Sequence, residues 1–107
     1  MKIYTIKATT GYTGLPVSLN KTVASEKALN DCAEKAFEIY KSKVAANPER
    51  LCKHVLRLCI WEQEPDANDI FHTVRLIYKD YRLINGKMEM FYEWHRENGI
   101  EKVVYQK

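Results

Sequence analysis

The sequence lacks a low-complexity tract, an internal repeat and a long apolar run. Its longest apolar stretch, Val55 to Trp61, is interrupted by Arg57 and is far shorter than the roughly 20 residues that span a bilayer. Met1 to Ile6 lack the long apolar segment of a signal peptide. These absences argue against disorder and membrane insertion. We expect a single domain over residues 1–107, located in the cytoplasm, with no membrane partner.

Cysteine is scarce and the charge is nearly balanced. The three cysteines are an odd number, so at least one has no partner within the chain, and reduced thiols are the simplest account. Seventeen basic residues stand against fourteen acidic ones, which gives a net charge of +3. Nucleic-acid binders are usually more basic, although a local patch can suffice. The charge therefore excludes little.

The first half of the chain predicts one strand, a short second strand and a long helix. Lys2 to Ala8 alternate in the manner of a strand, and after a glycine-rich loop Val17 to Leu19 suggest a short strand returning beside it. Ser25 is a suitable N-cap and Pro48 ends the periodic pattern, so we expect a helix over 25–46. Its core-facing stripe repeats at three- and four-residue steps: Leu29, Cys32, Ala33, Ala36, Phe37, Tyr40 and Val44.

The second half predicts a run of strands. Residues 56–61 alternate, with Leu56, Leu58 and Ile60 on one side. Residues 62–69 then predict an acidic loop, and residues 70–78 a further strand. We expect the core-facing side of that strand to carry Ile70, Val74, Leu76 and Tyr78.

Two Asn-Gly pairs predict hairpins, because Asn-Gly favours the tight turns that match strand twist. A turn at residues 85–86 gives three opposed pairs: Leu83 and Met88, Arg82 and Glu89, Tyr81 and Met90. A turn at residues 98–99 gives two: Trp94 and Val103, Tyr92 and Tyr105. Both registers match side chains of compatible character. Since the core-facing parity changes between Tyr78 and Tyr81, we expect a bulge near Lys79–Asp80.

The predicted order is β-α-β-β-β-β, an α+β fold with one long helix packed on an antiparallel sheet of about five strands. In architecture this order resembles the cystatin/monellin-type roll, in which a sheet wraps one helix. Cystatins carry a Gln-x-Val-x-Gly loop, whereas this chain has Glu62-Gln63-Glu64-Pro65-Asp66. The resemblance therefore implies a fold and does not imply protease inhibition.

No motif for catalysis or cofactor binding is visible. There is no Gly-x-Ser-x-Gly nucleophile elbow and no phosphate-binding glycine loop. His54, His72 and His95 have no recognisable nucleophile beside them. Cys52, His54 and Cys59 lie close in sequence, but neither a strand nor a helix would gather all three on one side. We expect a protein that is not an enzyme and that holds no metal and no cofactor.

The most informative pattern is the sheet face that points away from the helix. The residues assigned to it by alternation are aromatic and cationic: Arg57, Trp61, Phe71, Arg75, Arg82, Phe91 and His95. Tryptophan and arginine often anchor protein interfaces, and the same mixture can stack bases and meet phosphates. A half-covered monomer surface and a homodimer seam are the other interpretations.

The acidic loop adjoins this face, which makes Glu62, Glu64 and Asp66 candidate contacts for a basic groove of a partner. We expect a small non-enzymatic protein-binding domain, an adaptor or inhibitor of the kind that phages and mobile elements encode. Its partner would be another protein or a second copy. A nucleic-acid-binding protein that uses the same face is the alternative, and a small enzyme whose site is not visible in the sequence is third.

Overall fold

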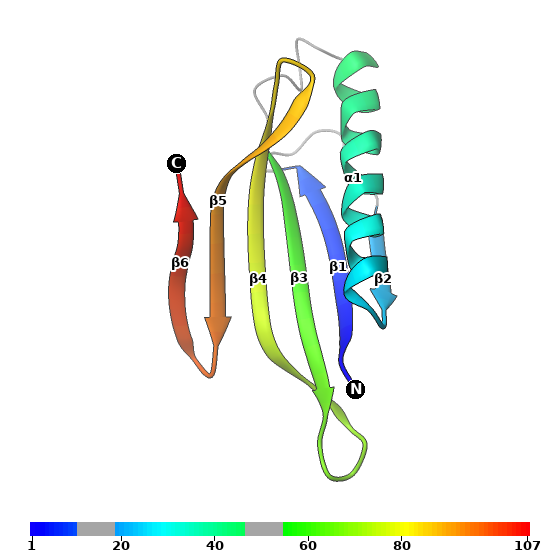
Figure 1. Ribbon diagram of the computed structural model, residues 1–107, viewed down its shortest axis with the longest axis vertical. Coiled ribbons are helices and arrows are strands. Elements are labelled where there is room, and N and C mark those ends of the chain that lie inside the picture. The colour runs from blue at the N-terminus through cyan, green and yellow to red at the C-terminus, as the bar shows by residue number, and fades with distance from the viewer. Residues whose placement is uncertain (11–18, 47–54) are drawn as a thin grey trace.

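One helix packs on a six-stranded antiparallel sheet in the computed structural model, which describes residues 1–10, 19–46 and 55–107 (Figure 1). The elements follow in this order: β1 (Ile3–Thr10), β2 (Leu19–Val23), α1 (Glu26–Ala46), β3 (Leu56–Pro65), β4 (Phe71–Ile84), β5 (Lys87–Glu97) and β6 (Ile100–Gln106). In space the strands lie in the order β2-β1-β3-β4-β5-β6. The α+β prediction is confirmed, and the sheet has one strand more than expected.

The additional strand is β2, which pairs antiparallel with β1 from Leu19 to Val23. The sequence placed a short strand at Val17 to Leu19, and positions 17–18 lie outside the described residues. The pattern ended the strand too early, because Asn20, Lys21 and Thr22 are polar. An edge strand tolerates such residues, since only one of its two long edges is paired.

The helix forms where the sequence predicts it, and it buries the predicted stripe. Ala28 N donates to Ser25 Oγ at 3.1 Å, so Ser25 caps the first turn. Cys32, Ala36 and Tyr40 are buried, and the remaining members of the stripe are partly buried against the same core. The apolar face of α1 is therefore buried against the sheet.

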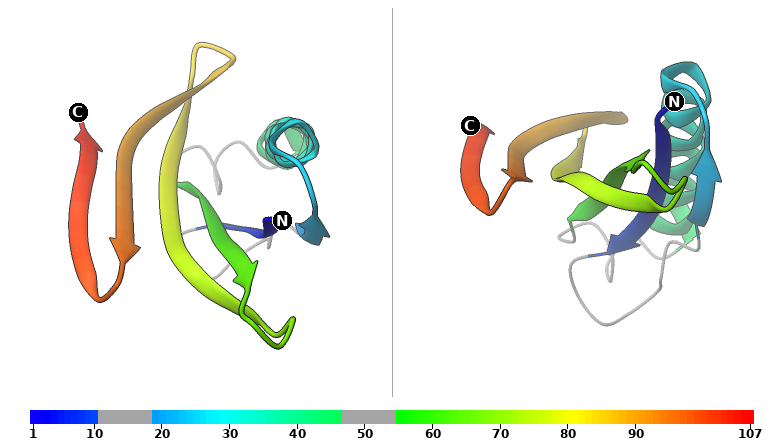
Figure 2. Two further views of the ribbon diagram at one scale, coloured as in Figure 1. Left: turned by 60° about the horizontal axis from the view of Figure 1, so that its bottom comes forward. Right: turned by 90° about the horizontal axis from the view of Figure 1, so that it is seen from below.

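The core lies between α1 and one half of the sheet. Even-numbered residues of β1 and β3 supply its sheet side: Tyr4, Ile6, Ala8, Leu56, Leu58 and Ile60. The helix lies over β1 and β2, while β5 and β6 extend away from it (Figures 1 and 2). Within the described residues, β6 and most of β5 thus have no helix on either face.

The predicted inward face of β4 is wrong. Ile77 pairs with the core residue Ile60 and joins the core, so odd-numbered residues of β4 face the helix, whereas Leu76 and Tyr78 point to the other side. Leu76 and Ile77 are both apolar and are both 7% exposed, so hydrophobicity alone did not distinguish the two faces. This correction decides which side chains share the uncovered face.

Both Asn-Gly turns form as predicted. Asn85, Gly86, Asn98 and Gly99 all have positive φ angles, between 52° and 80°, as a two-residue turn of this kind requires. The first hairpin has all three predicted pairs. In the second, Trp94 faces Val103 as predicted, but a register shift between positions 93 and 94 of β5 sets Tyr92 opposite Gln106 and not opposite Tyr105.

The register does shift between Asp80 and Tyr81, where a bulge was expected. The additional residue, however, is Phe91 of β5, because Asp80 pairs with Tyr92 and Tyr81 with Met90. Odd residues of β4 consequently face the helix on both sides of this point. The supposed change of parity came from assigning Leu76 and Tyr78 to the core.

The acidic loop is shorter than predicted, because β3 continues to Pro65. The connection that remains is organised by Asp66, whose Oδ1 accepts hydrogen bonds from the backbone N–H groups of Asn68, at 2.8 Å, and Ile70, at 3.1 Å. Among the described residues, no helix is both long and apolar enough to cross a membrane.

We predict that Gly86→Ala lowers the free energy of unfolding by about 1 kcal/mol, because a side chain is disfavoured at its φ of +80°. Gly99→Ala is the matched control, since a Cβ at either glycine would meet no atom within 4 Å. It strains a turn that leads into the exposed edge strand β6, so its main effect should be faster amide exchange in β6. Urea unfolding measures the free energy of unfolding of each variant, and amide exchange measures the opening of β6. Full stability of Gly86→Ala would contradict the turn conformation.

Candidate binding face of the sheet

The outer face, the side of the sheet that points away from α1, has no second layer in the described structure. Cross-strand pairing sorts its central side chains into three rows: Arg57, Asp80 and Tyr92; Cys59, Tyr78, Trp94 and Val103; Trp61, Leu76, Arg96 and Glu101. Directly opposite residues of neighbouring strands lie about 5 Å apart, so each row is continuous. Aromatic and cationic side chains from β3, β4 and β5 therefore meet on one surface.

A partly buried ion pair anchors the first row. Arg57 Nε donates to Asp80 Oδ1 at 2.7 Å, and Arg57 Nη2 donates to Asp80 Oδ2 at 2.9 Å. Asp80 is only 6% exposed, and this fork-to-fork geometry satisfies its carboxylate. The hydrogen bond to Asp80 raises the pKa of Arg57 above its ordinary value. The pair fixes the guanidinium in one orientation on the face.

Stacked side chains fill the second row. The Tyr78 and Trp94 rings stack with centroids 4.9 Å apart and planes inclined by 26°. The Arg57 guanidinium lies 4.9 Å from the Tyr78 centroid, and the Arg96 guanidinium lies 5.9 Å from that of Trp94. Guanidinium, phenol, indole and guanidinium thus follow one another across three strands, an arrangement stabilised by cation–π and ring stacking.

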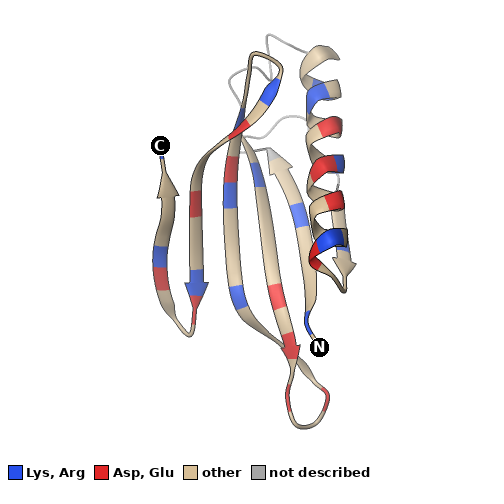
Figure 3. Cartoon of the chain, viewed as in Figure 1, with Lys and Arg blue, Asp and Glu red and all other residues tan. Residues whose placement is uncertain are grey.

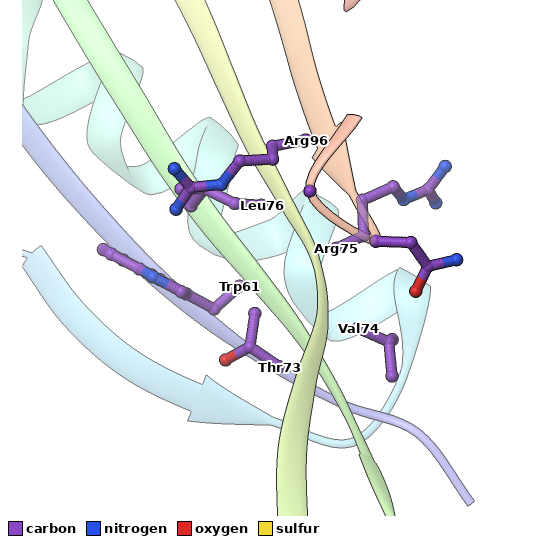
Figure 4. A pocket seen from close by; sticks show the side chains of 8 residues that line it. Trp61, Thr73, Val74, Arg75, Leu76 and Arg96 are labelled. Carbon is purple, nitrogen blue, oxygen red and sulfur yellow. The ribbon is translucent and has the colours of Figure 1, made fainter. Parts of the chain in front are cut away.

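A shallow pocket of about 360 Å³ occupies the third row. The Trp61 side chain from β3 and the Arg96 side chain from β5 extend in the same direction, with Leu76 of β4 between them (Figure 4). Thr73 lies on the same side of β4, whereas Val74 and Arg75 lie on the other. No acidic residue lines this pocket among the residues that the structure describes.

Five of the seven residues predicted for this face lie on it. Arg57 and Trp61 are central, and the Arg82 guanidinium lies 4.3 Å from the centroid of the Phe91 ring. Phe71 pairs with Pro65 at the far end of β4, away from the three rows. The placement of these five residues on one face is thus confirmed, while their role in binding stays a prediction.

Arg75 and His95 were predicted to lie on the outer face, and this prediction is wrong because both lie on the helix side of the sheet. Arg75 pairs with Glu62, and His95 pairs with the core-facing Ile77. Their misplacement follows from the wrong parity of β4. His95 Nε2 lies 2.6 Å from Glu93 Oε2, so it already has a carboxylate partner.

Glu62 was predicted to be a loop residue that contacts a partner. This prediction is wrong, because Glu62 is a strand residue and is only 6% exposed. Both of its oxygens accept hydrogen bonds from Arg75, with an Nε–Oε2 distance of 3.0 Å and an Nη2–Oε1 distance of 2.5 Å. The hydrogen bond to Glu62 raises the pKa of Arg75. Lys2 Nζ lies 3.7 Å from Glu62, so this carboxylate has no free oxygen to offer a partner.

The other two acidic candidates lie at the end of β3 and in the following connection, and both are exposed. Glu64 Oε1 is 3.9 Å from Lys2 Nζ, a distance at which an ion pair contributes little. Asp66 Oδ2 lies 2.7 Å from His72 Nε2, and this hydrogen bond lowers the pKa of Asp66. Asp66 therefore serves first to hold its own loop.

The prediction missed Tyr78, Trp94, Leu76 and Arg96. Leu76 and Tyr78 were assigned inward and Trp94 and Arg96 were given no face, because the parity of β4 was wrong and the register between β4 and β5 was not known. One signal was present: in the predicted hairpin, Trp94 opposes Val103, so neighbouring alternate positions of β5, including Arg96, share its face. The full face also requires the Ile60–Ile77 pairing and the β4–β5 register, in which Phe91 is the additional residue.

Chemistry on the described residues is limited. No group of three histidine, cysteine or acidic side chains there could hold a metal ion, and Cys52 and His54 lie outside those residues. Burial raises the pKa of the Cys59 thiol, which disfavours the reactive thiolate. Burial also raises the pKa of Tyr81 to about 12. These groups suit packing, and the outer face suits binding.

We predict that Arg57→Ala lowers the free energy of unfolding by about 2–3 kcal/mol, because it leaves the buried Asp80 carboxylate without its partner. Arg82→Ala is the matched control: it removes an arginine from the same face that lies over a ring and has no carboxylate partner among the described residues. Its loss should stay below about 1 kcal/mol. Equal losses in denaturant unfolding would contradict the role of the ion pair.

Comparison with known proteins returns no match. No protein-family model matches the sequence, and no curated protein and no solved structure is significantly similar to it. A function for this chain has to be inferred from the geometry of its own residues.

Proposed function

We propose that this chain is a small non-enzymatic protein-binding domain, which acts as an adaptor or inhibitor by occupying a partner with its outer face. The observation that carries the proposal is the stack of Arg57, Tyr78, Trp94 and Arg96 on a sheet face that has no second layer among the described residues. Tryptophan, tyrosine and arginine are the residue types that dominate binding energy in protein interfaces.

Three of the four side chains of this stack are preorganised. Arg57 is held by two hydrogen bonds to Asp80, and Tyr78 and Trp94 hold each other by stacking. Ordering long side chains on binding costs about 0.5–1.5 kcal/mol for each one. A face whose side chains are already fixed avoids much of this cost, which favours a recognition surface.

The charge pattern favours a protein over a polyanion. Acidic and basic residues are interspersed along β3 to β6 (Figure 3), and Arg57 is neutralised by Asp80. Polyanions are usually bound by clustered cations of one sign. A mixed surface with aromatic anchors is closer to the composition of protein interfaces.

The exposed edge strand β6 is another surface at which a partner could add. It exposes Ile100, Val103, Val104 and Tyr105 by 41–72%. It also carries Glu101 and Lys102, and its pairing with β5 shifts register. Charged residues and bulges are the devices by which proteins discourage pairing at a sheet edge. The outer face is therefore better supported than β6 as the binding surface, whether the partner is another protein or a second copy of this chain.

A second candidate function is binding of single-stranded nucleic acid by the same face. Arg82 and Arg96 lie over aromatic rings and have no carboxylate within ion-pair distance among the described residues. Such cations are available to phosphates, and neighbouring rings can stack on bases. The two candidates differ in how strongly salt should weaken binding.

We predict that the double variant Trp61→Ala, Arg82→Ala loses the partner that the parent captures from its native host. Both side chains are on the outer face and neither is in the helix-side core, so the variant should remain folded. Quantitative mass spectrometry of the captured material should show at least about a tenfold loss of the partner. Circular dichroism and thermal unfolding check the fold.

The matched control is Glu38→Ala, Lys102→Ala, which removes two exposed charges from α1 and β6 without touching the outer-face rows. It should retain the partner. Retention of the partner by the outer-face variant, or its loss in the control variant alone, would show that the interface lies elsewhere.

We predict that any binding to a single-stranded oligonucleotide is weak and falls only slightly with salt. With Arg82 and Arg96 as the free arginines, about two phosphates are neutralised, which corresponds to a slope of log K against log salt near −1.4. Fluorescence anisotropy with a poly-dT probe at several salt concentrations measures this slope. Tight binding with a slope steeper than about −4 would make nucleic acid the primary partner.

A further inference from the structure

Among the described residues, the outer face contains one aromatic side chain, Trp61, with no ring or cation partner and one cationic side chain, Arg96, with no carboxylate partner. Trp94 is stacked on Tyr78 and lies beside the Arg96 guanidinium, and Arg57 is engaged by Asp80. By contrast, no ring or cation lies against Trp61 among the described residues. Arg96 forms no ion pair with any of the described residues.

These two side chains belong to the same cross-strand row. Trp61 pairs with Leu76, and Leu76 pairs with Arg96. Their Cα atoms are thus separated by two strand spacings, about 10 Å. Leu76 is 7% exposed and forms an apolar floor between them. The two side chains extend from this floor in the same direction (Figure 4).

The polar groups of the pocket are mainly hydrogen-bond donors. The Trp61 indole N–H and the Arg96 guanidinium donate only, while the Thr73 hydroxyl and the Asn98 amide can donate as well as accept. No carboxylate lines the pocket in the described part of the chain. Glu101 pairs with Arg96 in the β5–β6 ladder but forms no ion pair with it. The pocket is therefore complementary to an anionic group.

We propose that the Trp61–Arg96 pocket binds a nucleotide unit, with the base on the Trp61 indole and the phosphate on the Arg96 guanidinium. A base stacked on an aromatic side chain is worth about 1–3 kcal/mol, and a guanidinium meets phosphate through paired hydrogen bonds. A simple anion would contact Arg96 but would make no contact with the Trp61 indole. A neutral aromatic ring would stack on Trp61 but would not engage the Arg96 guanidinium. A nucleotide uses both, across the span that the two strands set.

The inference rests on the proposed use of the outer face for binding, but it does not depend on a protein partner. Its chemistry, a base joined through a sugar to phosphate, is shared by a free nucleotide and by a unit of a single strand. The arms of the experiment distinguish these two sources.

Isothermal titration and saturation-transfer NMR on the purified full chain test the proposal with four probes: AMP, adenosine, inorganic phosphate and N-acetylglutamate. AMP should bind at least about tenfold more tightly than either adenosine or phosphate, because it gains both contacts. Addition of tetra-adenylate separates the sources: tighter binding per site than AMP assigns a strand, and equal binding assigns a free nucleotide.

The variants assign the two contacts separately. Arg96→Gln should weaken AMP about tenfold and leave adenosine unchanged, whereas Trp61→Ala should abolish the binding of adenosine. Trp61→Phe should retain both ligands. Lys102→Gln is the matched control, because Lys102 is an exposed cation of β6 that pairs with the helix-side His95 and lies outside the pocket, and it should leave the affinity for AMP within about twofold.

Three results would overturn the proposal: no binding of AMP at millimolar concentration, equal affinity for AMP and phosphate, or equal affinity for AMP and N-acetylglutamate. The last result would assign the pocket to a carboxylate of a protein partner. Loss of the captured partner in Trp61→Ala, Arg82→Ala with no binding of AMP would refute the nucleotide site and leave the protein-binding role intact.

Discussion

A single helix can cover only one face of a sheet, and the structure follows from this constraint. The helix buries its stripe against β1 and β3, and the core residues Ile6, Leu58 and Ile60 exclude water there. The opposite face has no such layer among the described residues. Its own side chains must shield the sheet, and stacked aromatic and arginine side chains do so while keeping their polar ends in water.

Two bidentate ion pairs lie on opposite faces of the same two strands. Arg57 of β3 holds Asp80 of β4 on the outer face, and Arg75 of β4 holds Glu62 of β3 on the helix side. Both carboxylates are nearly buried, so each needs its arginine to avoid a desolvated, unpaired charge. The two pairs also oppose a slip of β3 against β4, because a one-residue slip would separate both.

The sequence predicted the parts of the fold that local chemistry determines. The capped helix and both Asn-Gly turns depend on near neighbours, and the first hairpin register follows from its turn. The face of β4 depends instead on its register with β3, a contact between distant segments. Because Leu76 and Ile77 are both apolar, alternation allowed either face, and the wrong choice moved Arg75 and His95 to the outer face while it hid Arg96.

The same reasoning explains which part of the candidate site was found. Arg57 and Trp61 lie on β3, where alternation is unambiguous, and they were placed correctly. The pocket between Trp61 and Arg96 joins β3 to β5 through β4, so it required two registers to be known at once. A site built from cross-strand rows is visible only after the pairing of the strands is fixed.

The most direct test of the central claim is an NMR measurement of the two tryptophan indole N–H signals on addition of a purified partner. Trp61 and Trp94 both lie on the outer face, and the sequence contains no third tryptophan. If the outer face is the binding surface, both indole signals should shift while the amides on the exposed side of α1 stay in place. Shifts along α1 with unchanged indole signals would contradict the account.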